Sequence, residues 1–203
     1  MDEAMASKYE VLPGTPKIMG VDVARYGDDQ SVIARRHGRV LEPLHKFRGL
    51  STMQLVGEVG TLINKTRPDV VFVDETGLGA GVLDRLLELG FPAVGVNFGS
   101  SPLEENKTLY YNKRAEMWDL MRDWVEGGCQ MPHDQELRAD LIGPEYGFDS
   151  KMRKQLETKE SMKKRGLASP DCGDALALTF AFPAPATFGY TSVSVEPEPD
   201  PDY

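Results

Sequence analysis

Aspartate residues at three separate places in the chain could together hold divalent metal ions. Asp22 lies near the end of a short apolar run, Asp74 follows a second such run, and Asp171 and Asp174 are three residues apart. That last spacing puts both carboxylates on one face of a helix. Converging carboxylates repel one another unless a cation neutralises them. Mg²⁺ and Mn²⁺ prefer oxygen ligands, and two such ions about 4 Å apart can activate water for phosphodiester hydrolysis.

Each acid also has an explanation that needs no metal. Acidic residues are common at strand ends, and Asp171 near the start of a helix would interact favourably with the helix dipole. A single acid is therefore weak evidence for a metal site. The evidence becomes strong only if the fold brings the three positions together.

Five short strands are expected in the folded part of the chain. The first three form an antiparallel meander and the others are buried parallel strands, at Ile18–Val23, Ser31–Arg36, Arg39–Phe47, Asp69–Val73 and Ala93–Val96. A capping box at Ser51 and Gln54 begins a helix between the third and fourth strands. Another helix follows Gly77–Gly81, and a long one runs through Met117–Val125.

The last part of the chain combines an insertion with a final helix. Residues 132–166 predict a short helix plus a hairpin. Ser169 as N-cap and Pro170 at the first helical position predict the start of the final helix, which ends near Phe182.

This order of elements predicts an α/β fold of the ribonuclease H-like kind. The fold has a mixed sheet of about five strands flanked by helices, with a hairpin-containing insertion before the last helix. In this plan the fourth strand lies parallel beside the first. Asp22 and Asp74 are therefore expected to be neighbours.

Composition fits one globular domain between two tails. The chain has 203 residues, of which 40% are hydrophobic and 27% charged. Residues 1–16 predict a linker or tail, 17–183 the folded domain, and 184–203 a disordered, acidic, proline-rich tail. No apolar run approaches the roughly 20 residues of a membrane span, so no membrane partner is expected. The acidic N-terminal residues have no apolar stretch, so no secretory signal is expected, and two cysteines are too few for a disulfide framework.

Basic residues concentrate just before the final helix. The net charge of −9 argues against a protein that coats nucleic acid by bulk attraction. One segment nevertheless carries seven basic residues against Glu157 and Glu160, namely Lys151, Arg153, Lys154, Lys159, Lys163, Lys164 and Arg165. This segment is either a solvated face or a track for DNA phosphates, with contacts to the backbone and little sequence preference.

Three segments resemble motifs of the nuclease domain of large terminase subunits from tailed bacteriophages. They are Gly20–Ser31, Val73–Leu86 and Glu157–Phe180, and they occur in the family's order. The resemblance implies a ribonuclease H-like endonuclease that cuts concatemeric viral DNA during genome packaging. It also implies two Mg²⁺ or Mn²⁺ ions.

The resemblance assigns roles to individual residues. It places the acidic triad that holds the metals on Asp22, Asp74 and Asp174. Asp28 and Asp171 match positions that assist the second metal. Lys159 matches a lysine near the catalytic centre of some members.

The resemblance implies partners as well. They are double-stranded DNA, the terminase ATPase domain, the small terminase subunit and the portal, with action in the host cytoplasm. The chain contains no G-x-x-x-x-G-K-[ST] phosphate loop, so ATP hydrolysis is not expected of it. We expect either an excised nuclease domain or a motor that is a separate chain.

Two other functions are compatible with these observations. A junction resolvase of the same fold would also use carboxylates and Mg²⁺, although the motif at Lys163–Phe180 favours a terminase. In a non-catalytic docking module the acids would be structural and the tails would bind packaging partners. Cleavage of plasmid DNA on addition of Mn²⁺ separates these alternatives.

Overall fold

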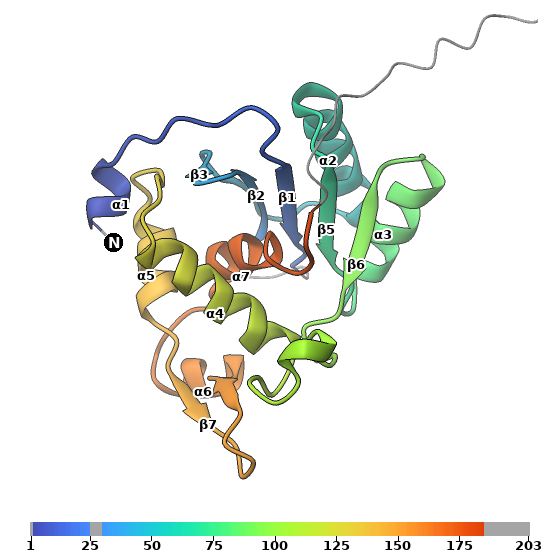
Figure 1. Ribbon diagram of the computed structural model, residues 1–203. Coiled ribbons are helices and arrows are strands. Elements are labelled where there is room, and N and C mark those ends of the chain that lie inside the picture. Colours follow the sequence, from blue (N-terminus) through green and yellow to red (C-terminus); the bar gives the residue numbers. More distant parts are fainter. Residues whose placement is uncertain (1, 25–29, 185–203) are drawn as a thin grey trace, which may run out of the picture.

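A mixed sheet forms the centre of the molecule. A computed structural model describes residues 2–24 and 30–184 (Figure 1). The strands follow the order β3-β2-β1-β5-β6, and β4 also pairs with β2. Their bounds are β1 (Lys17–Asp22), β2 (Ser31–His37), β3 (Val40–Leu41), β4 (His45–Phe47), β5 (Val70–Asp74) and β6 (Ala93–Val96). β1 is antiparallel to β2 and parallel to β5, so the predicted α/β fold with a mixed sheet is confirmed.

Helices cover both faces of this sheet. The described helices are α1 (Asp2–Ala6), α2 (Thr52–Thr66), α3 (Gly79–Glu88), α4 (Lys113–Glu126), α5 (Gln135–Ile142), α6 (Lys159–Lys164) and α7 (Asp171–Leu178), with a 3₁₀ turn at Glu104–Asn106. One apolar core lies between the sheet and α2 and α3. A second core lies between the opposite face and α7, with α1, α4 and α5 around it (Figure 1). None of the described helices has the length and apolarity to cross a membrane.

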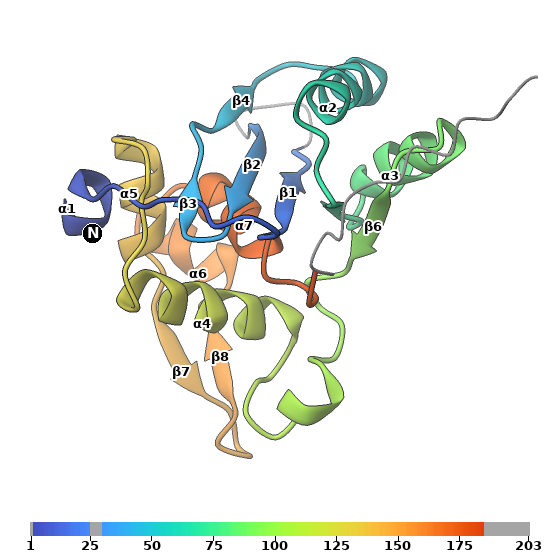
Figure 2. The ribbon, with the colours of Figure 1, turned by 45° about the horizontal axis from the view of Figure 1, so that its top comes forward.

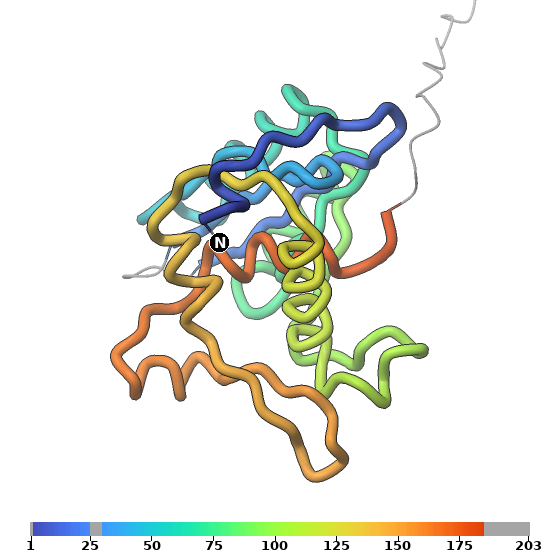
Figure 3. The backbone as a smooth tube through the Cα atoms, turned by 60° about the vertical axis from the view of Figure 1, so that its left-hand side comes forward, coloured from blue at the N-terminus to red at the C-terminus, as the bar shows by residue number. Residues whose placement is uncertain are grey.

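The insertion before α7 contains the expected hairpin. Strands β7 (Tyr146–Phe148) and β8 (Lys154–Leu156) form an antiparallel pair. Figures 2 and 3 both show this hairpin projecting from the rest of the domain. Helix α6, which follows β8, was not predicted as a separate element.

Short motifs in the sequence predicted the positions of most helices and strands correctly. Ser51 caps α2, and the reciprocal bond from the Ser51 N–H to the Gln54 side chain completes the predicted capping box. The expected third strand is divided into β3 and β4, because Pro43 has no N–H to donate to the ladder with β2.

The predictions for the N-terminal segment and for the bounds of the final helix were wrong. Residues 1–16 were expected to be a tail, but α1 buries Ala4 and Met5 in the core on the α7 side. The final helix begins at Asp171 rather than at Pro170, because Pro170 at ψ 57 is not helical. It ends at Leu178 rather than near Phe182. The predicted acidic tail lies outside the described residues from position 185 onward.

Candidate active site

The parallel pairing of β1 and β5 brings the first two acids together. Val21 lies opposite Val73, and Asp22 and Asp74 are the next residues of the two strands. Side chains alternate between the faces of a strand, and Phe72 packs in the core on the α7 side, so Asp74 faces that side as well. Asp22 is 4% exposed and Asp74 is 8% exposed. The predicted meeting of these two residues is therefore observed.

Helix α7 brings the third acid to the same place. A Cβ at Gly20 would lie 2.2 Å from the carbonyl oxygen of Ala175, so only glycine permits this close approach of α7 to β1. Asp174 precedes Ala175 and is fully buried. The contact sets the third carboxylate over the end of β1.

Burial disfavours the ionised form of the two carboxylates at the strand ends, those of Asp22 and Asp74. Burial raises the pKa of Asp22 well above its ordinary value, and Lys159 acts against that rise. The negative charges of Asp174, Asp171 and Asp74 raise the pKa of Asp22 further. Burial likewise raises the pKa of Asp74. A cation bound beside these groups would relieve both the desolvation and the repulsion.

Asp174 differs because it has strong partners inside the protein. Its Oδ1 accepts hydrogen bonds from Arg114 Nε at 3.0 Å and from Trp118 Nε1 at 2.8 Å. Its Oδ2 lies 2.9 Å from Lys159 Nζ and 3.4 Å from an Arg114 Nη atom. Burial acts to raise the pKa of Asp174, but Arg114 and Lys159 outweigh it and hold the pKa below its ordinary value.

Arg114 and Trp118 are site residues that sequence reasoning missed. From the sequence, Trp118 was placed only within the long helix expected through Met117–Val125, and Arg114 was not singled out. Their spacing of four places both side chains on one face of α4. That spacing was a usable signal, but nothing in the sequence indicated that this face meets Asp174.

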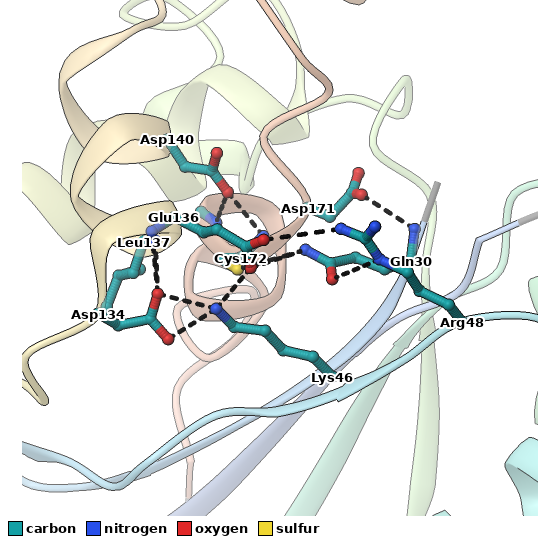
Figure 4. Close-up of polar contacts among 10 residues, drawn as sticks. Gln30, Lys46, Arg48, Asp134, Glu136, Leu137, Asp140, Asp171 and Cys172 are labelled. Carbon is teal, nitrogen blue, oxygen red and sulfur yellow. Dashed lines mark hydrogen bonds and ion pairs between the residues drawn. The ribbon is translucent and has the colours of Figure 1, made fainter. Parts of the chain in front are cut away.

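A carboxylate from α5 holds the start of α7. Asp140 Oδ2 accepts hydrogen bonds from the backbone N–H groups of Cys172, at 2.8 Å, and Gly173, at 3.2 Å (Figure 4). Asp140 thereby supplies the cap that Pro170 cannot provide. Burial raises the pKa of Asp140 to about 7, against the effect of these two N–H groups. Sequence reasoning missed this role.

Other polar groups surround the buried Asp171. The Gln30 N–H donates to Asp171 Oδ2 at 3.3 Å, and Lys46 Nζ contacts Asp134 and Glu136 at 2.7 and 2.6 Å (Figure 4). A cavity of about 610 Å³ opens beside Asp171. Its lining includes Gln30, Arg48, Glu136, Asp140, Lys159, Lys163 and Ser169.

The triad is close together but is not arranged as a finished metal site. Within residues 2–24 and 30–184, no three acidic, histidine or cysteine side chains are placed to hold a metal ion. The Asp174 carboxylate is turned toward Arg114, Trp118 and Lys159 instead. The donor set nevertheless suits a hard divalent cation, since it consists of buried carboxylate oxygens, and burial and neighbouring acids outweigh the effect of Lys159 on the pKa values of Asp22 and Asp74. The predicted ligand Asp28 lies outside the described residues.

The basic segment divides into two groups. Arg153 pairs with Asp149 at 2.6 Å, Lys154 with Asp119 at 2.7 Å, and Arg165 with Glu157 at 2.5 Å. Lys159 lies in the acidic site.

The remaining three, Lys151, Lys163 and Lys164, are exposed and form no ion pair with any residue that the structure describes. Within this segment, the second group therefore has side chains that can contact an external anion without giving up an ion pair with a described residue.

Solved structures with a similar fold were found. No family model and no curated protein sequence matches the chain. The nuclease domain of the large terminase subunit gp2 of bacterial virus Sf6 superposes with a TM-score of 0.74 and 22% identity, over 85% of this chain and 91% of that domain. The chain has the fold of a terminase nuclease domain.

Structures of similar terminase domains contain metal ions. A lysine-to-alanine variant of the Sf6 domain with manganese gives a TM-score of 0.70 at 21% identity, over 83% of this chain and 89% of that one. The large terminase nuclease from thermophilic phage G20c with bound magnesium gives a TM-score of 0.62 at 17% identity, over 84% of this chain and 82% of that one. The ribonuclease H-like fold class expected from the strand order is thereby confirmed.

Proposed function

We propose that this chain is a metal-dependent endonuclease that hydrolyses phosphodiester bonds of double-stranded DNA, in the role of a phage packaging nuclease. The observation that carries the proposal is the meeting of Asp22, Asp74 and Asp174 at the carboxyl ends of β1 and β5. The similarity of fold to the nuclease domains of Sf6 and G20c terminases supports it. The natural substrate would be concatemeric viral DNA.

The three aspartates are the groups that would hold two divalent ions. Asp22 and Asp74 supply carboxylates that form no ion pair with any residue in the described part of the chain, and Asp174 supplies Oδ2, the oxygen that faces the half-exposed Lys159. Asp171 and Asp28 would assist the second ion. When bound, Mg²⁺ or Mn²⁺ would supply an activated water and stabilise the leaving oxygen.

Lys159 has the role of an internal cation in this scheme. Its ammonium lies between acidic partners, and Asp174 and Asp22 raise its pKa even though burial acts to lower it. Lys159 therefore stays positively charged at neutral pH. Its charge offsets part of the negative charge of the acidic site, which bound metal ions would otherwise neutralise. Near the reacting phosphate the same charge would stabilise negative charge that develops during cleavage.

DNA contacts are proposed mainly for the second group of basic residues. Lys163 and Lys164 end α6, whose first residue is Lys159, and Lys163 lines the cavity beside Asp171. Lys151 lies at the turn of the projecting hairpin. Arg153, Lys154 and Arg165 would contact phosphate only by giving up the ion pairs described above. Contacts to the backbone alone would give little sequence preference.

The packaging role implies further partners that we also propose. They are the terminase ATPase domain, the small terminase subunit and the portal, and the site of action would be the host cytoplasm. These assignments depend on the resemblance to large terminase subunits and on the shared fold.

Plasmid cleavage tests the proposal directly. Supercoiled plasmid is incubated with the protein and increasing Mn²⁺, and the same series is run with Asp74→Asn. The control is Asp84→Asn, which changes an exposed acid of α3 on the other face of the sheet. We expect Mn²⁺-dependent nicking and linearisation by the wild type and the control only. No cleavage by the wild type would favour a docking module, and cleavage restricted to four-way junctions would favour a resolvase.

A further inference from the structure

The ring of Trp118 packs directly against the helix that carries the acidic pair. Helix α4 packs on α7, and a Cβ at Gly173 would lie 2.6 Å from Cη2 and 2.9 Å from Cζ2 of Trp118. Glycine weakens a helix relative to alanine. Its position between Cys172 and Asp174 is explained by this contact, because any side chain would displace the indole ring.

The contact with Gly173 places the indole N–H of Trp118 within hydrogen-bond distance of the buried Asp174 carboxylate. Trp118 Nε1 lies 2.8 Å from Asp174 Oδ1, the same oxygen that accepts from Arg114 Nε at 3.0 Å. Both donors belong to side chains that are almost completely buried, whereas the Lys159 side chain beside Oδ2 is 41% exposed. The two oxygens of Asp174 therefore differ: two short hydrogen bonds from buried donors hold Oδ1, whereas Oδ2 faces the movable Lys159 ammonium and only a longer 3.4 Å contact from Arg114.

We propose that Trp118 is a positioning residue of the metal site: its indole N–H, set by contact with Gly173, fixes the rotation of the Asp174 carboxylate so that Oδ2 is presented to the metal. The inference rests on the proposed function, since it assumes that Asp174 is a ligand. Hydrogen bonds of this kind orient ligating carboxylates and contribute strongly to metal affinity. Arg114 shares Oδ1 but also bonds the Glu157 carbonyl oxygen, so Trp118 is the donor devoted to Asp174.

The second tryptophan of the chain provides a matched control. Trp124 lies on the same helix, is 7% exposed like Trp118, and also donates one indole hydrogen bond, to the Gly38 carbonyl oxygen at 3.0 Å. Its ring contacts Phe180 rather than Gly173. Trp118→Phe and Trp124→Phe therefore remove the same chemical group from equally buried positions, and only the first removes it from Asp174.

The experiment measures Mn²⁺ affinity in the absence of DNA, from the free-ion signal in electron paramagnetic resonance. We expect Trp118→Phe to weaken binding by about tenfold or more. Trp124→Phe should bind Mn²⁺ like the wild type, although thermal melts should show both variants losing stability. Because phenylalanine also leaves space, a second variant carries benzothienylalanine at position 118, which keeps the two-ring shape and lacks only the N–H. It should weaken binding to the same extent.

Three results would overturn the positioning role. Equal affinity of Trp118→Phe and Trp124→Phe, with a wild type that binds Mn²⁺ and cuts plasmid, rejects the positioning role and leaves the nuclease proposal standing. Full affinity of the benzothienylalanine protein, with weak binding by Trp118→Phe, shows that packing rather than the N–H matters. A wild type that neither binds Mn²⁺ nor cuts plasmid rejects the proposed function and this inference with it.

Discussion

Lys159 Nζ and Asp174 Oδ2 are 2.9 Å apart, and one partner is far more accessible than the other. The Asp174 side chain is completely buried, while the Lys159 side chain is 41% exposed and begins the short helix α6. The ammonium can therefore leave Oδ2 by rotating its own side chain, without movement of α7. In the absence of metal, Lys159 neutralises an acidic site that would otherwise be strongly self-repelling.

The first prediction concerns the competition between this ammonium and a metal ion. Lys159→Ala should tighten Mn²⁺ binding in the absence of DNA by about tenfold, because a unit positive charge close to the site is removed. The same change should lower the rate of plasmid cleavage at saturating Mn²⁺ by about a hundredfold, because charge that stabilises the reacting phosphate is lost. Titration of free Mn²⁺ and single-turnover cleavage measure the two effects.

Lys163→Ala is the matched control for this variant. It removes the same charge from the same helix, at an exposed position one turn later. Its Mn²⁺ affinity and cleavage rate at saturating DNA should equal those of the wild type. Unchanged Mn²⁺ affinity in Lys159→Ala would show that the lysine does not compete with the metal.

The second prediction distinguishes the three aspartates by stability. Replacement of Asp22, Asp74 or Asp174 by Asn should abolish Mn²⁺-dependent cleavage in each case. Asp22→Asn and Asp74→Asn should leave the metal-free protein as stable as the wild type or more stable, because each removes a poorly compensated buried charge.

Asp174→Asn should behave differently. It leaves Arg114 and Lys159 without the carboxylate that both contact, and should lower the free energy of unfolding by about 3 kcal/mol. The sequence alone offered no reason to separate Asp174 from the other two acids, because Arg114 was not foreseen and Lys159 was expected only near the catalytic centre. Chemical denaturation without metal measures the difference. Equal stability of the three variants would contradict the assigned ion pairs.

The strand arrangement was accessible from the sequence because its signals are local. The run Val70–Val73 has the continuous apolar character of a strand buried on both faces, and a parallel partner for it could only be one of the few other strands. Once Ile18–Val23 is that partner, Asp22 and Asp74 must meet at the strand ends. The capping box at Ser51 and Gln54 is similarly local.

The surroundings of Asp174 could not be predicted from the sequence, because they depend on contacts between residues far apart in the chain. Arg114 is 60 positions before Asp174, and its side chain reaches the acid only because α4 packs on α7. The acids that pair with Arg153 and Arg165 are much nearer in sequence, at Asp149 and Glu157, but these pairs form only because the chain turns at the hairpin and at the end of α6. Net charge counted along the segment therefore overestimated the positive charge that is free to contact DNA.

The third prediction concerns pH and begins with Asp140. Its pKa is raised from 3.8 to about 7 in the folded protein, mainly by burial. Between these values the folded state keeps a proton that the unfolded state has lost, so the stability of the metal-free protein falls as pH rises through this window. The raised pKa values of Asp22 and Asp74 act in the same direction.

Thermal melts between about pH 5 and about pH 8 measure this slope. Asp140→Asn should reduce it, since the amide stays neutral while its oxygen can still cap α7. Asp134→Asn is the control: the pKa of Asp134 is lowered by Lys46 and by backbone N–H groups despite burial, so this variant should be less stable throughout with an unchanged slope. Saturating Mn²⁺ should stabilise most at the higher pH, because metal and proton compete for the carboxylates. An Asp140→Asn slope equal to that of the wild type would contradict the raised pKa.

The last prediction concerns how an acidic protein holds DNA. With a net charge of −9 the overall field repels phosphate, so attraction must come from local cations and bound metal. Lys163 and Lys164 are exposed and lie on the helix that begins at Lys159. Replacing both by Ala should weaken binding to any duplex. The slope of the logarithm of the binding constant against the logarithm of salt concentration should become shallower by about two, one for each lost phosphate contact.

The design of this test uses two comparisons. Lys8→Ala with Lys65→Ala removes the same charge from exposed positions, and Lys65 lies in the last turn of α2 on the opposite face of the sheet. The DNA binding of this double variant should therefore be unchanged. Arg153→Ala should also have little effect, because its guanidinium is already held by Asp149. Filter binding of two unrelated duplexes at several salt concentrations measures all of these proteins, with Mn²⁺ affinity as the test of an intact site. Wild-type affinity and salt slope in the Lys163/Lys164 variant would show that the end of α6 is only a solvated face, and DNA would then have to approach the acids from another side.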